Sequence, residues 1–364
     1  MDHQILLQRL SERFGVGEDV LSWIRSYLSN RVQRVRIGKS TSPRIALQCG
    51  VPQGSVLGPI LFNMYVSPLY DIAVQHGVYT HQYADDCQLY VELKVGDDDA
   101  GSDGAITKLE ECVRDIAEWM GANKLKLNEE KTEIIVFSPR NETPSRNHFQ
   151  IGEVDIAPKQ CVKDLGVFLE ASLHAERHVN HICAVGYFHL SNIAAIRNSL
   201  NKECAEKLLH AFVTSKLDFC NSLLVFLPDF LTSKLQRLQN AVAKLVTKRP
   251  RREHVTPLLM ELHWLPVRQR IRFKICCIVW KCVHGEAPDY AKSLITMYNP
   301  ARDLRSASNI SLVVRQPRTN LGRRAFVVAG PMIWNELPTA VRAMTDFNDF
   351  KKCLKTFLFT EAFH

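Results

Sequence analysis

The spacing of apolar residues changes once along the chain, from a mixture of helical and alternating patterns to an almost purely helical one. Apolar residues at helical spacing predict helices over the first thirty residues and again around 106–120. After about Leu173 helical periodicity continues to Val283, and residues 286–364 then hold five prolines among mixed signals. The pattern predicts an α+β part (1–172), a helical part (173–285) and a small irregular C-terminal region (286–364).

Strands are expected only in the first part. Residues 34–37 alternate basic and apolar side chains before Gly38, as in a strand that enters a hairpin. Aromatic and β-branched residues between Val78 and Leu93 flank an acidic turn, which predicts two short strands joined at that turn. A further strand is expected at 132–137, and 149–156 is expected to pair with 162–169. The loop GVPQGSVLGP, 50–59, leads into an apolar stretch that predicts a buried helix.

Composition limits the class of protein. The chain has 364 residues and is 46% hydrophobic, enough for ordinary cores, and its net charge of +8 is compatible with a polyanionic partner without demonstrating one. Its eleven cysteines show neither CxxC spacing nor a Cys/His ladder, which favours reduced thiols over a disulfide framework or a zinc site. No leader pattern and no apolar run of about 18 residues is present, so an intracellular protein without a membrane segment is expected. Nucleus or cytoplasm stays open, as does the oligomeric state.

The sharpest chemical feature is the adjacent pair Asp85 and Asp86 at the expected hairpin tip. Two carboxylates held by rigid strands offer the oxygen ligands that magnesium prefers. Aspartate is also favoured in turns for local hydrogen bonding, so a solvated acidic turn is the alternative. By themselves the two residues leave both interpretations open.

The surroundings of this pair resemble a known family. The box Tyr83-Ala84-Asp85-Asp86 lies about thirty residues after Gly50-Val51-Pro52-Gln53-Gly54-Ser55, and together, in this order, they resemble the YxDD box and PQG loop of reverse transcriptases. LNEEKTE at 127–133 and Leu165-Gly166-Val167 are similar to the next two motifs of that family. The segments QRLQNAVAKLV (236–246), HWLPVRQRIRFK (263–274) and GPMIWNELP (330–338) resemble the C-terminal part of jockey-like non-LTR retrotransposon (LINE) polymerases.

The resemblance implies a right-handed polymerase. Its fold would be a partial palm, an antiparallel sheet with helices and without the fingers, over 1–172, followed by a helical thumb over 173–285 and a C-terminal appendage. The implied function is RNA-directed DNA synthesis from an RNA template, a DNA primer and deoxynucleoside triphosphates. Two Mg²⁺ ions and no small-molecule cofactor would serve it.

Residue roles follow from the same resemblance. Asp85 and Asp86 would bind catalytic Mg²⁺, Asp85 more directly, and Tyr83 would pack beside the primer end. The nucleotide and template pocket would be shaped by Pro52, Gln53 and Gly54.

Two further motifs carry implied roles. Lys131 would lie near the leaving pyrophosphate as a proton donor, although a solvated lysine before a strand is the alternative. Leu165 and Gly166 would belong to the hairpin that grips the primer.

Basic residues of the helical part allow more than one interpretation. The cluster Lys248, Arg249, Arg251 and Arg252, and the alternating residues of 268–274, fit phosphate contacts. They fit a solvated helix end and a solvated helix face equally, and the cluster also fits a nuclear import patch.

A two-metal site needs a further carboxylate from another strand. In the resembling family it belongs to a pattern F-D-x-x-D-H, of which the opening Met1-Asp2-His3 matches only the end. We therefore expect an N-terminally truncated fragment that does not polymerise DNA alone. A noncatalytic nucleic-acid-binding remnant and a decayed transposable-element copy without an independent role are the alternatives.

Overall fold

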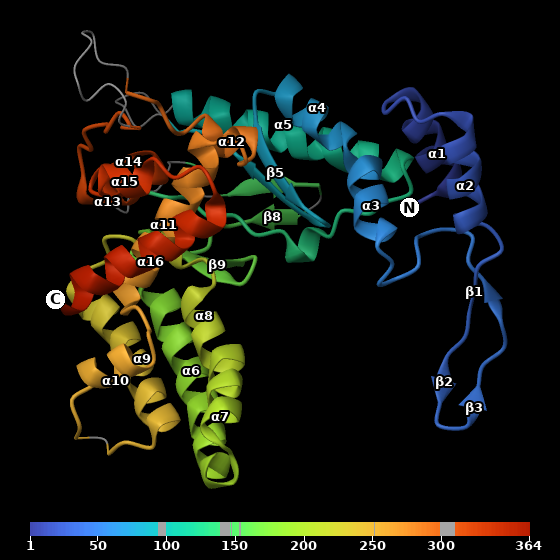
Figure 1. Ribbon diagram of the computed structural model, residues 1–364. Helices are drawn as coiled ribbons and strands as arrows, with labels where there is room; N and C mark the ends of the chain where they lie inside the picture. Colours follow the sequence, from blue (N-terminus) through green and yellow to red (C-terminus); the bar gives the residue numbers. More distant parts are fainter. Residues whose placement is uncertain (94–99, 139–145, 147, 153, 251, 299–309) are drawn as a thin grey trace. The chain divides into compact units, whose positions relative to one another are not determined.

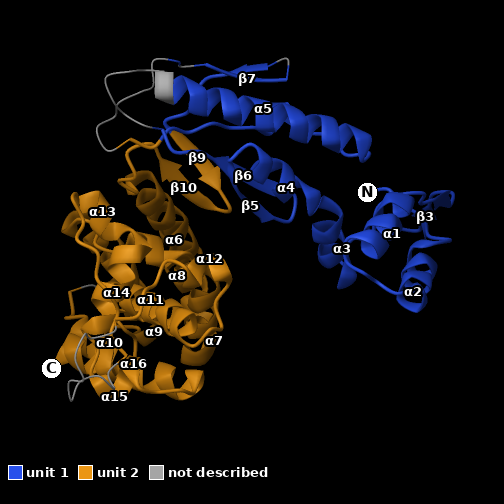
Figure 2. Ribbon diagram, turned by 90° about the horizontal axis from the view of Figure 1, so that it is seen from above, with its two compact units in different colours: residues 1–136, 142–160 blue, residues 137–141, 161–364 orange. Residues whose placement is uncertain are grey.

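The computed structural model describes all residues except 94–99, 139–145, 147, 153, 251 and 299–309 (Figure 1). The chain divides into two compact units, shown in Figure 2: unit 1 comprises 1–136 and 142–160, and unit 2 comprises 137–141 and 161–364. Helices combined with two-stranded antiparallel ribbons build the described residues, which confirms a mixed α+β fold. The functional boundaries near 172 and 285 remain predictions.

Unit 1 joins helices to four short ribbons. Its helices are α1 (His3–Glu12), α2 (Glu18–Leu28), α3 (Leu57–Val66), α4 (Pro68–Gln75), α5 (Ala100–Ala122) and the 3₁₀ turn η1 (Glu129–Lys131). Its ribbons pair β1 (Val32–Gln33) with β4 (Ile45–Ala46), β2 (Arg36–Ile37) with β3 (Ser40–Thr41), β5 (Tyr79–Tyr83) with β6 (Asp86–Tyr90), and β7 (Phe149–Ile151) with β8 (Val154–Ile156).

The regular elements described in unit 2 are one ribbon, followed by helices. The ribbon pairs β9 (Cys161–Asp164) with β10 (Val167–Glu170). The helices are α6 (Glu176–Ile196), η2 (Arg197–Ser199), α7 (Lys202–Leu209), η3 (His210–Thr214), α8 (Ser215–Asp218), η4 (Asn221–Leu224), α9 (Asp229–Thr247), α10 (Thr256–Glu261), α11 (Val267–Val283), α12 (Asp289–Lys292), α13 (Asn320–Arg324), α14 (Phe326–Asn335), α15 (Thr339–Arg342) and α16 (Phe347–Phe363).

The core of unit 1 forms where apolar residues at helical spacing meet. Leu6 and Leu10 of α1 are buried against α2 and α3, and Cys112 and Ile116 of α5 belong to the same cluster. Burial of a side chain of this size contributes about 1.5–3 kcal/mol. The predicted helices of the first thirty residues and of 106–120 are therefore confirmed by the faces that they bury.

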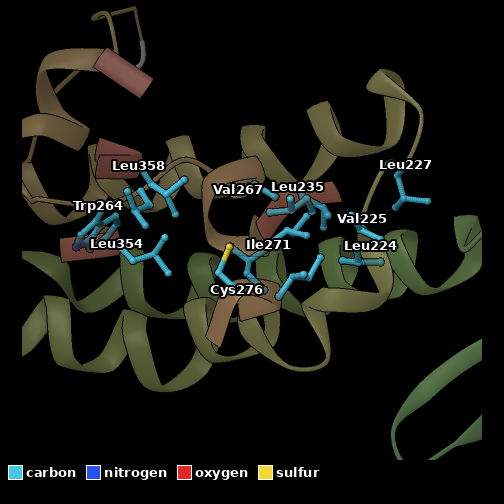
Figure 3. Close-up of a cluster of buried hydrophobic side chains, with 14 of the residues drawn as sticks. Leu224, Val225, Leu227, Leu235, Trp264, Val267, Ile271, Cys276, Leu354 and Leu358 are labelled. Carbon is cyan, nitrogen blue, oxygen red and sulfur yellow. The ribbon is translucent and has the colours of Figure 1, made fainter. Parts of the chain in front are cut away.

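The core of unit 2 is built around α11, whose residues Ile271, Ile275 and Val279 are buried against α9, α14 and α16 (Figure 3). Two tryptophans are almost completely buried, and the indole N–H group of each donates a hydrogen bond. Trp280 Nε1 donates to the Met344 carbonyl at 2.8 Å, and Trp334 Nε1 donates to the Ile310 carbonyl at 2.9 Å. Their rings thus enter the core without leaving an unpaired donor.

Buried amides connect the helices of unit 2. Gln239 of α9, almost fully buried, donates to the Leu265 carbonyl at 2.9 Å, and the Gln236 side-chain oxygen accepts from Val267 N at 2.8 Å. Asn335 accepts from Leu312 N and donates to the Leu312 carbonyl, as a neighbouring strand would. These bonds satisfy backbone groups that would otherwise be buried without a partner.

Several arginines stabilise the fold through hydrogen bonds and ion pairs. Arg197, which is 5% exposed, donates to the carbonyls of Leu200, Leu245 and Val246, where the last two end helix α9. On α11 each arginine of the alternating stretch has a carboxylate partner: Arg268 pairs with Asp229, Arg270 with Asp218, and Arg272 with Glu336 and Glu361.

Two strand predictions were wrong. Within the described residues, the segment 132–137 has no strand partner: Lys159 N donates to the Ile134 carbonyl at 2.7 Å, but no ladder forms. The segments 149–156 and 162–169 do not pair with each other, because each folds back on itself. Gly152, with φ of +59°, lies between β7 and β8, and Leu165-Gly166 reverses the chain between β9 and β10.

The C-terminal region is more regular than expected. Proline precedes α12 and α15 as the N-cap residue, Pro288 and Pro338, and Pro331 lies inside α14. A proline at the start of a helix loses no helical hydrogen bond, so Pro288 and Pro338 mark helix starts. Among the described residues no helix has both the length and the apolarity of a membrane span.

Gly186 provides a test of the packing in unit 2. A Cβ at this position would lie 3.2 Å from Cδ1 of the buried Leu238 and closer still to Cδ2, because α6 and α9 lie side by side there. We expect Gly186→Ala to lower the free energy of unfolding by about 1–3 kcal/mol in urea denaturation followed by circular dichroism.

The matched control is Gly121→Ala on α5, where a Cβ would meet nothing within 4 Å. Alanine is a better helix former than glycine, so this change is expected to be neutral or to stabilise by up to about 1 kcal/mol. Equal stability of Gly186→Ala and the parent would contradict the close approach of α6 and α9.

Candidate active site

The acidic pair lies where the sequence predicted it, at the tip of the β5–β6 hairpin. Tyr83 pairs with Asp86, so Ala84 and Asp85 form a two-residue turn. Ala84 adopts a φ of +55°, a left-handed conformation that the tight reversal requires. Both carboxylates are exposed at the tip.

One face of this hairpin is aromatic and open. Residues directly opposite each other share a face, so Tyr79, His81 and Tyr83 lie on the same side as Tyr90 and Asp86. The rings of Tyr79 and Tyr90 stack with centroids 5.1 Å apart, and Tyr83 beside the acidic turn is 67% exposed. The opposite face contributes Leu89 to the unit 1 core, so the hairpin is anchored on one side only.

The loop that contains Pro52, Gln53 and Gly54 is tied to the N-terminal segment. Gly50 N donates to the Met1 carbonyl at 2.7 Å, and His3 Nε2 donates to the Gly50 carbonyl at 2.7 Å. Gly54 has a φ of +81° with open space around the position of a Cβ, so its backbone conformation is what requires glycine there. Pro52 is half-buried, whereas Gln53 and Gly54 are exposed.

Tyr65 on α3 supports the same N-terminal segment through hydrogen bonds of its hydroxyl group. Its hydroxyl accepts from Asp2 N at 3.2 Å and donates to the Asn123 carbonyl at 2.5 Å. Arg9 adds a bond to Asn123 Oδ1 at 2.6 Å and places its guanidinium 5.0 Å from the Tyr65 ring centroid. Desolvation raises the pKa of Tyr65, which keeps the hydroxyl a donor.

Lys131 is exposed at the end of η1. Its backbone N–H donates to Asn128 Oδ1 at 3.3 Å, which caps the turn, and its side chain takes part in no ion pair within the described residues. The neighbouring Glu133 is instead paired with Lys159 at 2.6 Å. The role of Lys131 stays a prediction.

Leu165 and Gly166 form the turn between β9 and β10, with φ values of +43° and +88°. A Cβ on Gly166 would lie 3.4 Å from Cε1 of Phe219, so this turn packs against the segment that follows α8. The turn belongs to unit 2, whereas Asp85, Pro52 and Lys131 belong to unit 1. Its role in gripping a primer stays a prediction.

The basic cluster lies at the end of α9. Lys248 has a φ of +54° and ends the helix, while Arg249 Nε lies 3.8 Å from Glu253 Oε1. Lys248, Arg249 and Arg252 are exposed, and Arg251 lies outside the described residues. The exposure of these side chains is compatible with phosphate contacts, with a solvated helix end and with a nuclear import patch.

The acidic turn provides only some of the ligands that a divalent cation needs. Asp85 and Asp86 present oxygen ligands of the kind that Mg²⁺ binds. Within the part of the chain that the structure describes, no three His, Cys, Asp or Glu side chains are grouped so that they hold a metal.

The acidic turn, the PQG loop and the Leu165-Gly166 turn all lie within one segment that matches a known protein family. Residues 1–169 match the family described as reverse transcriptase (RNA-dependent DNA polymerase). The chain is related to the reverse transcriptases of non-LTR retrotransposons. The match ends at Leu169, within β10, and includes the acidic turn, the PQG loop and Leu165-Gly166.

Three polymerases of Drosophila melanogaster are similar to the chain. The probable RNA-directed DNA polymerase from transposon X-element is 26% identical over 243 residues, which are 62% of this chain and 24% of the relative. The probable polymerase from transposon BS is 29% identical over 161 residues, 43% and 17% of the two chains. The polymerase from mobile element jockey is 27% identical over 190 residues, 50% and 20%. The chain thus matches a quarter or less of the length of these reverse transcriptases.

Sequence reasoning missed the residues that support the N-terminal segment and the PQG loop bound to it. Asp2 was considered only as a motif remnant, yet its side chain caps α1 by accepting from Gln4 N at 2.9 Å, and its backbone binds Tyr65. An N-cap aspartate before an apolar helix was a signal that was available. Tyr65 carried no such signal, because its role depends on contacts with residues 58 and 63 positions away.

Tyr65→Phe tests this support. The change leaves Asp2 N and the Asn123 carbonyl without their partner, and we expect a loss of about 1–3 kcal/mol in the free energy of unfolding of unit 1. Hydrogen exchange of residues 49–54 should accelerate as well, because the N-terminal segment holds this loop. Tyr70→Phe on the exposed face of α4 is the matched control; if both variants behave alike, Tyr65 does not support the loop.

Proposed function

We propose that this chain contributes the palm and thumb of an RNA-directed DNA polymerase from a non-LTR retroelement. The observation that carries the proposal is the exposed Asp85-Asp86 turn, held by a hairpin whose other face is anchored in the core, inside a segment that matches the reverse transcriptase family. Residues 1–172 would act as palm, 173–285 as thumb and 286–364 as an element-specific appendage. The substrates would be an RNA template, a DNA primer end and deoxynucleoside triphosphates.

The acidic turn would act as a ligand pair. Asp85 and Asp86 would hold Mg²⁺ through carboxylate oxygens, Asp85 more directly, as the resemblance to reverse transcriptases implies. Bound Mg²⁺ would activate the primer hydroxyl and stabilise charge on the departing pyrophosphate. Tyr83, on the same face as Asp86, would pack beside the primer end.

The remaining residues would position substrates. Gly54 would allow the backbone to approach the nucleotide closely, with Pro52 and Gln53 beside it. Lys131, exposed and without an ion-pair partner in the described residues, would protonate the leaving pyrophosphate. The Leu165-Gly166 turn would contact the primer strand.

A two-metal mechanism needs a further carboxylate besides Asp85 and Asp86. The proposal therefore includes a carboxylate contributed from outside the part of the chain that the structure describes. Polymerase activity is expected only when that group is present.

A second function is nucleic-acid binding without synthesis. The exposed Lys248, Arg249 and Arg252 support it, because backbone contacts to phosphates need neither a metal nor a catalytic carboxylate. Primer extension and binding, measured on the same protein, separate the two functions.

The test is extension of oligo(dT) on poly(rA) with Mg²⁺, using both the 364-residue chain and the longest reading frame of its locus that contains it. We expect Asp85→Asn with Asp86→Asn to lower extension by at least about 10²- to 10³-fold, the loss typical of removing a group that stabilises transition-state charge.

The matched control is Asp19→Asn with Asp103→Asn, which removes two other carboxylates of unit 1, on α2 and α5. Extension that survives loss of Asp85 and Asp86 would refute the assignment of the metal ligands. Nucleic-acid binding without extension in either form of the protein would favour the second function.

A further inference from the structure

An extended ribbon in unit 1 has no role in the function proposed above. Residues 31–46, here called the basic arm, comprise the β1–β4 and β2–β3 pairs and the turn at Gly38, whose φ is +59°. Ser42 N donates to the Val35 carbonyl and Val35 N donates to Ser42 Oγ, both at 2.9 Å, and these bonds join the two pairs into one ribbon. Figure 1 shows this ribbon extending away from α1 and α2 of its own unit.

The basic arm contributes nothing to the core. All of its residues are exposed apart from Ser42, which is half-buried. Its β-branched side chains are open to solvent, up to 77% for Ile37 near the tip. A two-stranded ribbon without a covered face is marginally stable in water, so an arm of this kind gains stability from a bound partner.

The charge of the arm identifies the chemistry of that partner. From Val20 to Tyr70 the chain contains no Asp or Glu, whereas Arg31, Arg34, Arg36, Lys39 and Arg44 all lie in the arm. Within the described residues none of these five cations is paired with a carboxylate. Uncompensated positive charge on an exposed element attracts a polyanion.

The cations are also arranged for contact along an extended surface. Arg34 and Arg36 alternate with Val35 and Ile37, so successive side chains project to opposite sides of the ribbon. Arg31 is partly committed, since its Nε donates to the Tyr27 carbonyl at 2.7 Å. Arg34, Lys39 and Arg44 have no hydrogen bond of this kind in the described structure and remain available.

We propose that the basic arm binds the phosphodiester backbone of nucleic acid. A two-stranded ribbon lying along a nucleic-acid backbone can reach several phosphates with its guanidinium and ammonium groups, and these contacts do not depend on base sequence. The choice of nucleic acid as the polyanion rests on the proposed function. The charge and exposure of the arm do not depend on Asp85 or Asp86.

The test compares the parent chain with the variant Arg34→Gln, Lys39→Gln and Arg44→Gln. Fluorescence anisotropy with a labelled RNA–DNA hybrid and a labelled single-stranded RNA, from about 50 to about 200 mM KCl, gives the affinity and its salt dependence. Loss of three phosphate contacts should weaken binding to the hybrid roughly 10- to 100-fold. The slope of log affinity against log salt should become shallower by about 2 to 3.

Two further variants make the result specific. Lys108→Gln, Lys216→Gln and Lys355→Gln remove the same charge from exposed positions on α5, α8 and α16, and should leave the affinity within about twofold of the parent. Arg34→Lys with Arg44→Lys keeps the charge and should retain the salt slope, because phosphate attraction does not require a guanidinium.

Equal losses in the arm variant and the distributed lysine variant would overturn the proposal, as would arm-dependent binding to phosphatidylserine vesicles without arm-dependent binding to nucleic acid. The titrations are done in EDTA without nucleotides, where the acidic turn holds no metal. Failure of the arm to bind is therefore distinguishable from failure of the polymerase proposal, which only primer extension reports.

Discussion

Residues with a left-handed backbone conformation lie at the chain reversals in most of the segments that the sequence motifs single out. Such a conformation costs an L-residue about 1–2 kcal/mol, so it persists only where surrounding contacts fix the turn. Ala84 beside the two aspartates, Leu165 in the β9–β10 turn and Lys248 at the end of α9 all have positive φ, as does Gly54 in the PQG loop. At Ala84 the reversal exposes the two aspartates, while Leu89 on the opposite face of the hairpin packs against the unit 1 core. At Lys248 it ends a helix whose residues Val242 and Val246 are buried. The cores of the two units thus fix turns, and the turns present the candidate chemistry.

The sequence predicted the elements whose signal is local. The α5 helix and the β5–β6 hairpin followed from spacing and from the turn-forming Ala84-Asp85, because both depend on neighbours within a few residues. The pairing of 149–156 with 162–169 failed because Gly152 and Gly166 reverse the chain inside or beside each segment, so local closure replaced the longer connection. The helical C-terminal region was missed because its prolines were taken as breaks, although Pro288 and Pro338 are N-caps. The acidic turn itself was found at its correct place, whereas the support from Tyr65 depends on distant contacts that no local pattern records.

The basic residues of this chain have several different roles, which the composition alone does not distinguish. Arg197 and Arg342 are buried and bind backbone carbonyls, where desolvation lowers the pKa of Arg342. The arginines of α11 are paired with carboxylates from other elements, so the alternating stretch contributes ion pairs between elements of unit 2. Only the cations that remain exposed and unpaired in the described structure, such as Arg34 in the basic arm, are left for a polyanion.

The separation of the basic arm from both cores affects how freely its sequence can vary. Substitutions in a packed helix such as α11 must preserve volume and partners, whereas Ile37 or Arg34 can change without altering any buried contact. Insertions at Gly38 would lengthen the ribbon at small entropic cost. The arm is therefore a segment whose length, charge and side chains can diverge while the packed fold that carries it is unaffected.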